Sequence, residues 1–257
     1  LRRAGPPVGI RCVLIQQRQR ALTGAEDGQR IRDRVRHVRP RLAKRVRELA
    51  VPLGPHDEIP VTRRALELSP SNTRAQSELG LHLMRTGDEA EARRLLESSF
   101  KVFPYDRVTV NLLALLDKLE KFDVVRDGDL VLKFDPNETR VLREYAVPLA
   151  QEALKKLSGT YQFTPKGPIL IEIFPIHDDF AVRNLGLPGL VGALGACFGR
   201  VVSMDSPRAK PPGTFSWQAT LWHELAHVVT LQMSNQRVPR WLTEGVSVYE
   251  EGREKPS

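Results

Sequence analysis

Two histidines four residues apart, His223 and His227, constrain this chain more than any other feature of its sequence. On a helix, residues at this spacing project from one face, so both imidazoles can reach the same point. Glu244 follows after sixteen intervening residues and is the natural source of a third ligand. A zinc site that keeps one position open for water usually has three protein ligands. The spacing therefore predicts a Zn²⁺ site formed by His223, His227 and Glu244.

The residues around the histidine pair favour a helix. Several prolines and a glycine precede it and oppose an earlier helix start, whereas Thr214 or Ser216 can cap a helix that runs to about Ser234. The apolar residues of this segment recur at helical spacing. They are Leu221, Leu225, Val228, Val229 and Leu231.

A second, shorter helix is predicted from about Pro239 to Gly252, with Glu244 in its early part. Glu224 lies next to the first histidine, placed to take a proton from water but wrongly angled to be a ligand. The alternative is that the histidine pair is a coincidence on a buried helix and that Glu244 is an ordinary solvated carboxylate near a helix start.

The segment from about 122 to 251 resembles the gluzincin zinc metallopeptidases, in particular the peptidase-MA-like domain of bacterial proteins that also carry tetratricopeptide repeats. The residues that carry the resemblance are His223, Glu224, His227, the stretch 241–245 (WLTEG) and the stretch 249–251 (YEE). The resemblance implies hydrolysis of peptide bonds, with Glu224 as the general base and the three predicted ligands holding Zn²⁺. It also implies that a strand before the motif helix lies along the peptide substrate, and residues 197–202 are the candidate.

The chain departs from the gluzincin pattern after Glu244. Gluzincins usually add a His or Tyr that stabilises the oxyanion, often from a helical subdomain, but only thirteen residues follow Glu244. We therefore expect a truncated domain that lacks its C-terminal subdomain, in a chain that is a fragment. Tyr249 is the candidate for the oxyanion role, and Glu250 and Glu251 are candidate partners of the ligating histidines.

Positive charge is concentrated at the N-terminus. Residues 1–66 contain fifteen Arg and one Lys against six acidic residues, a net charge of +10, while the whole chain has +8. With scattered prolines and no apolar periodicity, residues 1–60 are predicted to be disordered or weakly helical. A nucleic-acid-binding arm is a less favoured interpretation, and translation from an upstream frame is another.

Residues 61–121 indicate helical repeats. Ala65 and Pro70 recur thirty-four residues later as Ser99 and Pro104, a period that resembles the tetratricopeptide repeat. The complete unit is 71–104, with Gly87 and Asp88 at the turn between its helices, and a third unit decays over 107–121. Such repeats predict a structural role or a protein partner.

The remainder, 122–257, has mixed helix and strand signals, so the predicted fold class is α+β. Asp127-Gly128 is the best hairpin signal, a helix is predicted from about 138 to 158, and strands are predicted at 169–174 and 197–204. The run 177–179 (HDD) is interpreted as a helix start and not as a second metal cluster.

Three functions remain from the sequence. The first is a zinc-dependent peptidase domain joined to repeats, acting on a peptide or protein substrate. The second is a repeat-based binding scaffold with an inactive peptidase-like domain. The third, a nucleic-acid binder, is less favoured.

The two cysteines, Cys12 and Cys197, do not form a disulfide framework, and no apolar run is long enough for a membrane span. The compartment is not determined.

Overall fold

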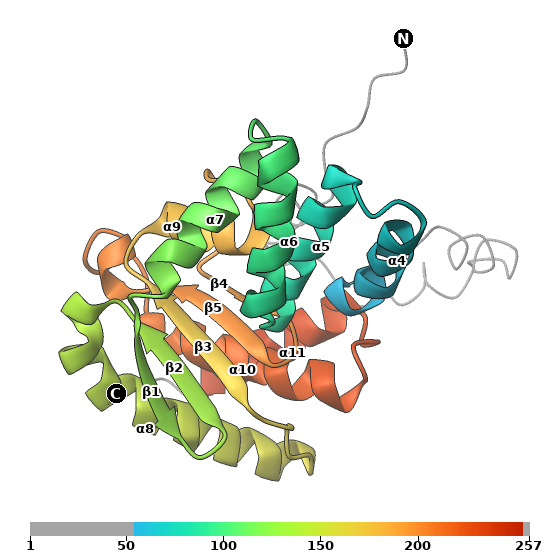
Figure 1. The fold of residues 1–257 in the computed structure, drawn as a ribbon. Coiled ribbons are helices and arrows are strands. Elements are labelled where there is room, and N and C mark those ends of the chain that lie inside the picture. The colour runs from blue at the N-terminus through green and yellow to red at the C-terminus, as the bar shows by residue number, and fades with distance from the viewer. Residues whose placement is uncertain (1–53, 254–257) are drawn as a thin grey trace, which may run out of the picture. The chain divides into compact units, whose positions relative to one another are not determined.

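A computed structural model describes residues 54–253 of the chain, and this part combines helices with a mixed sheet (Figure 1). The α+β class expected from the sequence is confirmed. Most of the Arg-rich stretch, with Cys12 and the possible nucleic-acid arm, lies in residues 1–53, outside the described part.

Five strands form one sheet in the order β1-β2-β3-β5-β4. They are β1 (Asp123–Asp127), β2 (Leu130–Phe134), β3 (Ile169–Phe174), β4 (Gly195–Cys197) and β5 (Val201–Asp205). The three central strands β2, β3 and β5 are parallel, whereas β1 and β4 run antiparallel to their neighbours. The sheet therefore ends on one side at the short strand β4.

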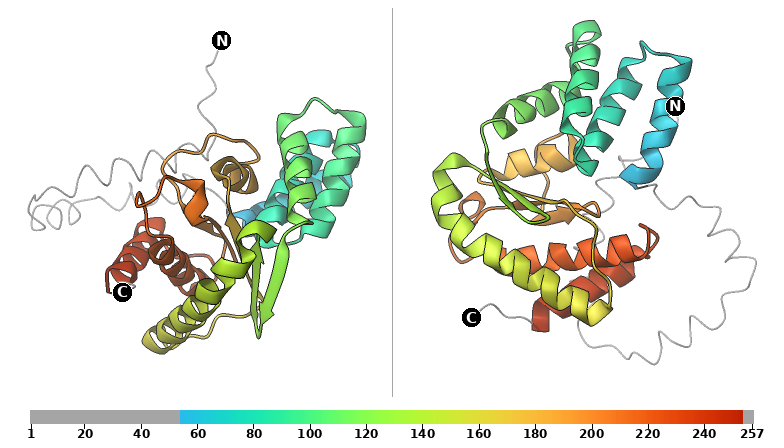
Figure 2. Two further views of the ribbon diagram at one scale, coloured as in Figure 1. Left: turned by 90° about the vertical axis from the view of Figure 1, so that its left-hand side faces the viewer. Right: turned by 60° about the horizontal axis from the view of Figure 1, so that its bottom comes forward.

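Eight α-helices and one short 3-10 helix, η1 (Pro207–Ala209), accompany the sheet in the described part of the chain. The helices are α4 (Pro55–Leu68), α5 (Thr73–Thr86), α6 (Glu89–Val102), α7 (Arg107–Leu119), α8 (Pro136–Tyr161), α9 (His177–Leu185), α10 (Trp217–Met233) and α11 (Arg240–Arg253). Helices α8 and α10 share one apolar core with the sheet, and α11 packs on α10. Helices α5, α6, α7 and α9 share a second core on the opposite face (Figures 1 and 2).

The predicted hairpin is present. Asp127 pairs with Leu130, so Gly128 and Asp129 form the two-residue turn, and Gly128 has a φ of 55° that favours glycine. The strand predicted at 169–174 is β3, and five of its six residues are buried, as expected for a central parallel strand that is covered on both faces.

The predicted pair of helices in 71–104 is also present, as α5 and α6. Asn72 and Asp88 cap their first turns, and Gly87 ends α5 with a left-handed φ of 91°. A Cβ on Gly80 would lie 2.8 Å from Leu96 Cγ, so the absence of a side chain lets the two helices pack closely. We call α4, α5, α6 and α7 the helical layer.

A buried charged network joins the helical layer to the sheet. Glu172 on β3 contacts Arg183 of α9 at 2.6 Å and Lys133 of β2 at 3.3 Å, and Lys133 also contacts Glu89 at 2.6 Å. Burial opposes ionisation of Glu172, but the two cations outweigh it and lower its pKa. Because breaking a buried pair leaves an uncompensated charge, this network ties α6 and α9 to β2 and β3.

One prediction of secondary structure was wrong. The expected strand 197–204 is a hairpin, because Gly199, with a φ of 87°, allows a tight turn closed by the Phe198 N–H donating to Val201 O. Residues 55–60, which were expected to be disordered or weakly helical, form the first part of α4, which begins at Pro55. Pro55 suits the first turn of a helix. The acidic side chains of Asp57 and Glu58 also lie in this turn, where they interact favourably with the positive end of the helix dipole.

No helix within residues 54–253 is long and apolar enough to cross a membrane.

Candidate metal centre

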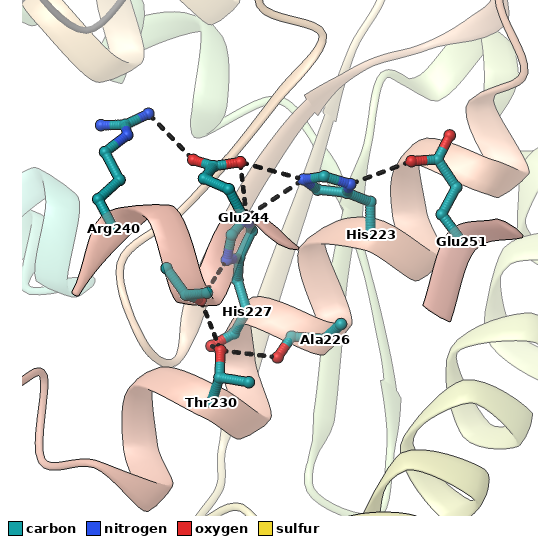
Figure 3. Close-up of polar contacts among 8 residues, drawn as sticks. His223, Ala226, His227, Thr230, Arg240, Glu244 and Glu251 are labelled. Atoms are coloured by element: carbon teal, nitrogen blue, oxygen red, sulfur yellow. Dashed lines mark hydrogen bonds and ion pairs between the residues drawn. The ribbon is translucent and has the colours of Figure 1, made fainter. Parts of the chain in front are cut away.

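Helix α10 places the two histidines as the sequence predicts. Ser216 caps it by accepting a hydrogen bond from the Ala219 N–H, and the helix runs from 217 to 233 within the apolar core. His223 and His227 lie on one face, with their Nε2 atoms 3.2 Å apart (Figure 3). Both rings are mostly buried, so the protein fixes their orientation.

Helix α11 brings Glu244 to the same place. One carboxylate oxygen, Oε2, lies 3.6 Å from His223 Nε2 and 3.5 Å from His227 Nε2. These three donor atoms lie within 4.8 Å of one another and could hold a metal ion. No second group of three or more such residues was found among the described residues.

The other ring nitrogen of each histidine is also engaged. His223 Nδ1 lies 3.1 Å from Glu251 Oε2, and His227 Nδ1 lies 2.7 Å from Thr243 Oγ1. Glu251 therefore orients one ring and Thr243 the other. Of the two predicted partners of the histidines, Glu250 has a different role, because it accepts a hydrogen bond from the Tyr161 hydroxyl at 2.7 Å.

A chain of hydroxyl groups determines which nitrogen of His227 carries the proton. Thr230 Oγ1 donates to Ala226 O at 3.1 Å, so the Thr243 hydroxyl donates to Thr230 and its oxygen is left to accept. The donor to that oxygen is then the Nδ1–H of His227. This tautomer leaves the lone pair of Nε2 directed at the cluster, as a metal ligand requires.

Arg240 contacts the second oxygen of Glu244, with Nη2 3.1 Å from Oε1. Burial alone would raise the pKa of Glu244, but its contacts with His223 and His227 and the positive charge of Arg240 lower it well below its usual value. Glu244 is therefore a carboxylate with one oxygen held by Arg240 and the other directed at the imidazoles.

The pKa of His223 is also shifted. Burial lowers it, but hydrogen bonds with Glu244 and Glu251 and the charge of Glu224 outweigh this effect and raise the pKa to about 10. In the metal-free chain both ring nitrogens of His223 thus carry a proton at neutral pH. A metal ion at Nε2 would have to displace that proton.

Glu224 lies beside the three donor atoms but not among them. It is 5% exposed, and its Oε2 has no hydrogen-bond partner. A Cβ built on Gly195 of β4 would lie 2.5 Å from Glu224 Oε1, so the carboxylate rests against the backbone of the edge strand. Burial raises the pKa of Glu224 and outweighs the opposing effect of the two histidines.

The other polar residues considered in the sequence lie elsewhere. Tyr249 comes five positions after Glu244, about 140° further around the helix, and is 59% exposed, so it does not face the cluster. The run 177–179 does not gather at a metal site: His177 Nδ1 lies 2.7 Å from Asp205, while Asp179 pairs with Lys118. Its helix start lacks a side-chain cap, because Ile176 is the N-cap residue.

Sequence reasoning missed the roles of Thr243 and Arg240. Both flank Glu244 on α11, at one position and four positions before it. The spacing of Arg240 and Glu244 is that of a helical ion pair and could have indicated this contact. No sequence signal links Thr243 with Thr230 on a different helix.

Comparisons of the chain with family models, with curated proteins and with solved structures gave no match.

Replacing Thr243 with Val should weaken binding of a divalent metal ion about 10–100-fold, because the His227 Nδ1–H loses its acceptor. Metal affinity measured by competition with a chromogenic chelator tests this expectation. Thr160→Val, at an exposed position of α8, is the matched control. Equal affinities in the two variants would contradict the orienting role of Thr243.

In the metal-free chain, His223 should titrate at about pH 10 and not near 6.5. Because folding raises this pKa, the protonated ring stabilises the metal-free fold fully below pH 6.5, and that stabilisation is lost as the pH rises to about 10. NMR titration of the histidine side chains measures the midpoint. Glu251→Gln should lower it, and a midpoint near 6.5 in the wild type would refute the assignment.

Proposed function

We propose that this chain is a zinc-dependent peptide hydrolase of the gluzincin type, carrying tetratricopeptide-like repeats. The observation that carries the proposal is the mutual placement of three donor atoms from α10 and α11. Two imidazole nitrogens and one carboxylate oxygen lie at pairwise distances of 3.2, 3.5 and 3.6 Å.

These distances fit a zinc ion. Ligands about 2.1 Å from a tetrahedral zinc lie about 3.4 Å from one another. The donor set of two histidines and one glutamate is that of hydrolytic zinc sites, in which the fourth position is left to water. The ring nitrogens not used for a metal are hydrogen-bonded to Glu251 and Thr243, as in most histidine-ligated sites.

Glu224 is the proposed general base. When bound, zinc would supply acidification of water and polarisation of the scissile carbonyl. Glu224 accepts a proton from water as the water oxygen bonds to the carbonyl carbon. It then donates that proton to the amine nitrogen as the C–N bond breaks, which yields a carboxylic acid and an amine. The raised pKa of Glu224 suits this exchange, because a base whose pKa is closer to neutrality returns its proton more readily.

The edge strand β4 is the proposed binding site for the peptide backbone. Phe198 N–H donates to Val201 O and Asp205 N–H to Leu194 O across the β4–β5 hairpin. Residues on an antiparallel strand alternate in direction, so Gly195 and Cys197 direct their N–H and C=O groups to the outer edge. An extended peptide can pair there beside Glu224. This assignment moves the expected substrate strand from 197–202 to 195–197.

The proposed repeat assignment is supported by the burial of the small and apolar positions in α5 and α6. Leu79, Leu83, Ala92, Leu96 and Ser99 are all at most 3% exposed. Gln76, which stands where a large aromatic residue is usual, instead donates to Pro70 O and Ser98 Oγ. A protein or peptide bound by these helices is the partner that such repeats imply.

Glu224→Gln should reduce cleavage of a peptide library at least about 100-fold, because the amide cannot accept a proton. Bound zinc, measured by elemental analysis, should remain, whereas His223→Ala should lose it. Glu152→Gln, at an exposed ion pair on α8, serves as the control. If Glu224→Gln and wild type cleave equally, the alternative of an inactive binding scaffold replaces the enzyme.

Gly195→Ala should abolish cleavage while the zinc content stays near one per chain. The added methyl group would lie 2.5 Å from Glu224 Oε1, so either the carboxylate or β4 must move. The matched control is Gly159→Ala on α8, where nothing lies within 4 Å of the added Cβ. Full activity of the first variant would contradict the placement of Glu224 against β4.

A further inference from the structure

We infer that the helical layer holds the edge strand β4 in place opposite Glu224, and that Arg85 of α5 is the positioning residue that transmits this restraint. The inference rests on the proposed function in assigning substrate binding to β4. Its structural part stands on contacts between the helical layer and the β4–β5 hairpin.

Strand β4 lies between two layers of the fold. Gly195 faces Glu224, and Cys197 packs against the core that contains α10. Ala196, between them, packs against the opposite core formed by α5, α6, α7 and α9. This alternation is the geometry of a strand with both faces covered. The helical layer therefore packs on the face of β4 that is opposite to the face that Glu224 contacts.

The strand itself is short and held by few bonds. It has three residues, lies last in the sheet order and pairs only with β5. Edge segments with few hydrogen bonds open locally at low cost in free energy. Contacts outside the sheet must therefore contribute to its position.

Arg85 supplies the most specific of these contacts. Its guanidinium carbon lies 5.6 Å from the centre of the Phe198 ring, within the range of a cation–π interaction. Its Nε and Nη2 donate to Asn184 O at 2.8 and 2.5 Å. These two bonds fix the plane of the guanidinium group against the aromatic ring.

Asn184 connects Arg85 with the sheet. It is 3% exposed, and its side-chain oxygen accepts a hydrogen bond from Ser203 Oγ of β5 at 2.9 Å. Arg85 thus has two links to the β4–β5 hairpin. It donates to Asn184, which is hydrogen-bonded to Ser203 of β5, and it contacts Phe198 in the turn after β4. A shift of α5 would change the position of the turn relative to β5.

Other contacts enclose the same turn. His56 Nε2 of α4 lies 3.3 Å from Phe198 O, and Gln232 of α10 donates to Gly199 O at 3.3 Å. A Cβ on Gly199 would lie 2.2 Å from Gln236 Nε2, so the turn has no free space on that side. The turn is held between the helical layer and the end of α10, and its position relative to Glu224 depends on both.

The test is Arg85→Leu in the full chain, with zinc added. We expect backbone amides of the hairpin, such as Phe198 and Asp205, to exchange with deuterium at least about tenfold faster than in wild type. Zinc affinity should change less than about twofold, because Arg85 lies on α5 whereas the proposed ligands lie on α10 and α11. The matched control is Arg74→Leu on the same helix, whose side chain is 87% exposed and paired with Glu78.

Three further variants keep the test decisive. Phe198→Leu removes the ring and should cause the same faster exchange, and adding Arg85→Leu to it should produce little further change. Arg85→Lys keeps a cation near the ring but loses the paired guanidinium bonds to Asn184, so it should restore only part of the protection. If hairpin exchange in Arg85→Leu or in Phe198→Leu equals that of wild type, the inference is overturned, whether or not the chain cleaves peptides.

Kinetics then tests the link to substrate. With a cleaved peptide, Arg85→Leu should raise KM about tenfold and leave kcat within about threefold, because β4 binds the backbone while the chemistry lies at Glu224. Faster exchange with unchanged KM would refute the role of the helical layer in substrate binding. The failure of the proposed function itself is distinguishable, because it would appear as equal cleavage by wild type and Glu224→Gln.

Discussion

The close approach of α10 and α11 is the interaction on which the account of this structure depends. It places a carboxylate oxygen of α11 beside two imidazole nitrogens of α10 that lie 3.2 Å apart. Two lone pairs that face each other at this distance are unfavourable unless a positive charge lies between them. A proton can take that place in the metal-free chain, which agrees with the pKa of about 10 for His223. A divalent ion fits the same place, so the cluster is a site for which the two compete.

The cluster is enclosed by contacts on three sides. The motif helix is embedded in the apolar core on one face of the sheet, and Glu251 and Thr243 of α11 hold the outer nitrogens of the two rings. Strand β4 lies against Glu224 and is backed by the helical layer on the opposite side. Segments from the first and last parts of the described chain thus contribute to one centre. This arrangement gives the helical layer a structural part in the site in addition to any partner that it binds.

Much of this site could be predicted from the sequence because its geometry is local. The i, i+4 pair of histidines, the Ser216 cap and the helix that carries Glu244 all follow from helical periodicity and turn signals. The contacts of Thr243 with Thr230 and of Phe198 with Arg85 could not be predicted, because they join segments distant in sequence through tertiary packing. The sequence predicts one strand over 197–204, whereas the structure has a turn there between β4 and β5. The positive φ of Gly199 makes it a turn residue, and this conformation is not visible in the pattern of side chains.

X-ray absorption spectroscopy at the zinc edge, on the full chain loaded with one equivalent of Zn²⁺, tests the central claim most directly. The account predicts a first shell of nitrogen and oxygen atoms at about 2.0–2.2 Å, with the multiple scattering of two imidazoles. Replacing His227 with Ala should remove the signal of one imidazole. A shell without imidazole scattering, or one with sulfur at about 2.3 Å, would show that the metal binds elsewhere and would contradict the account.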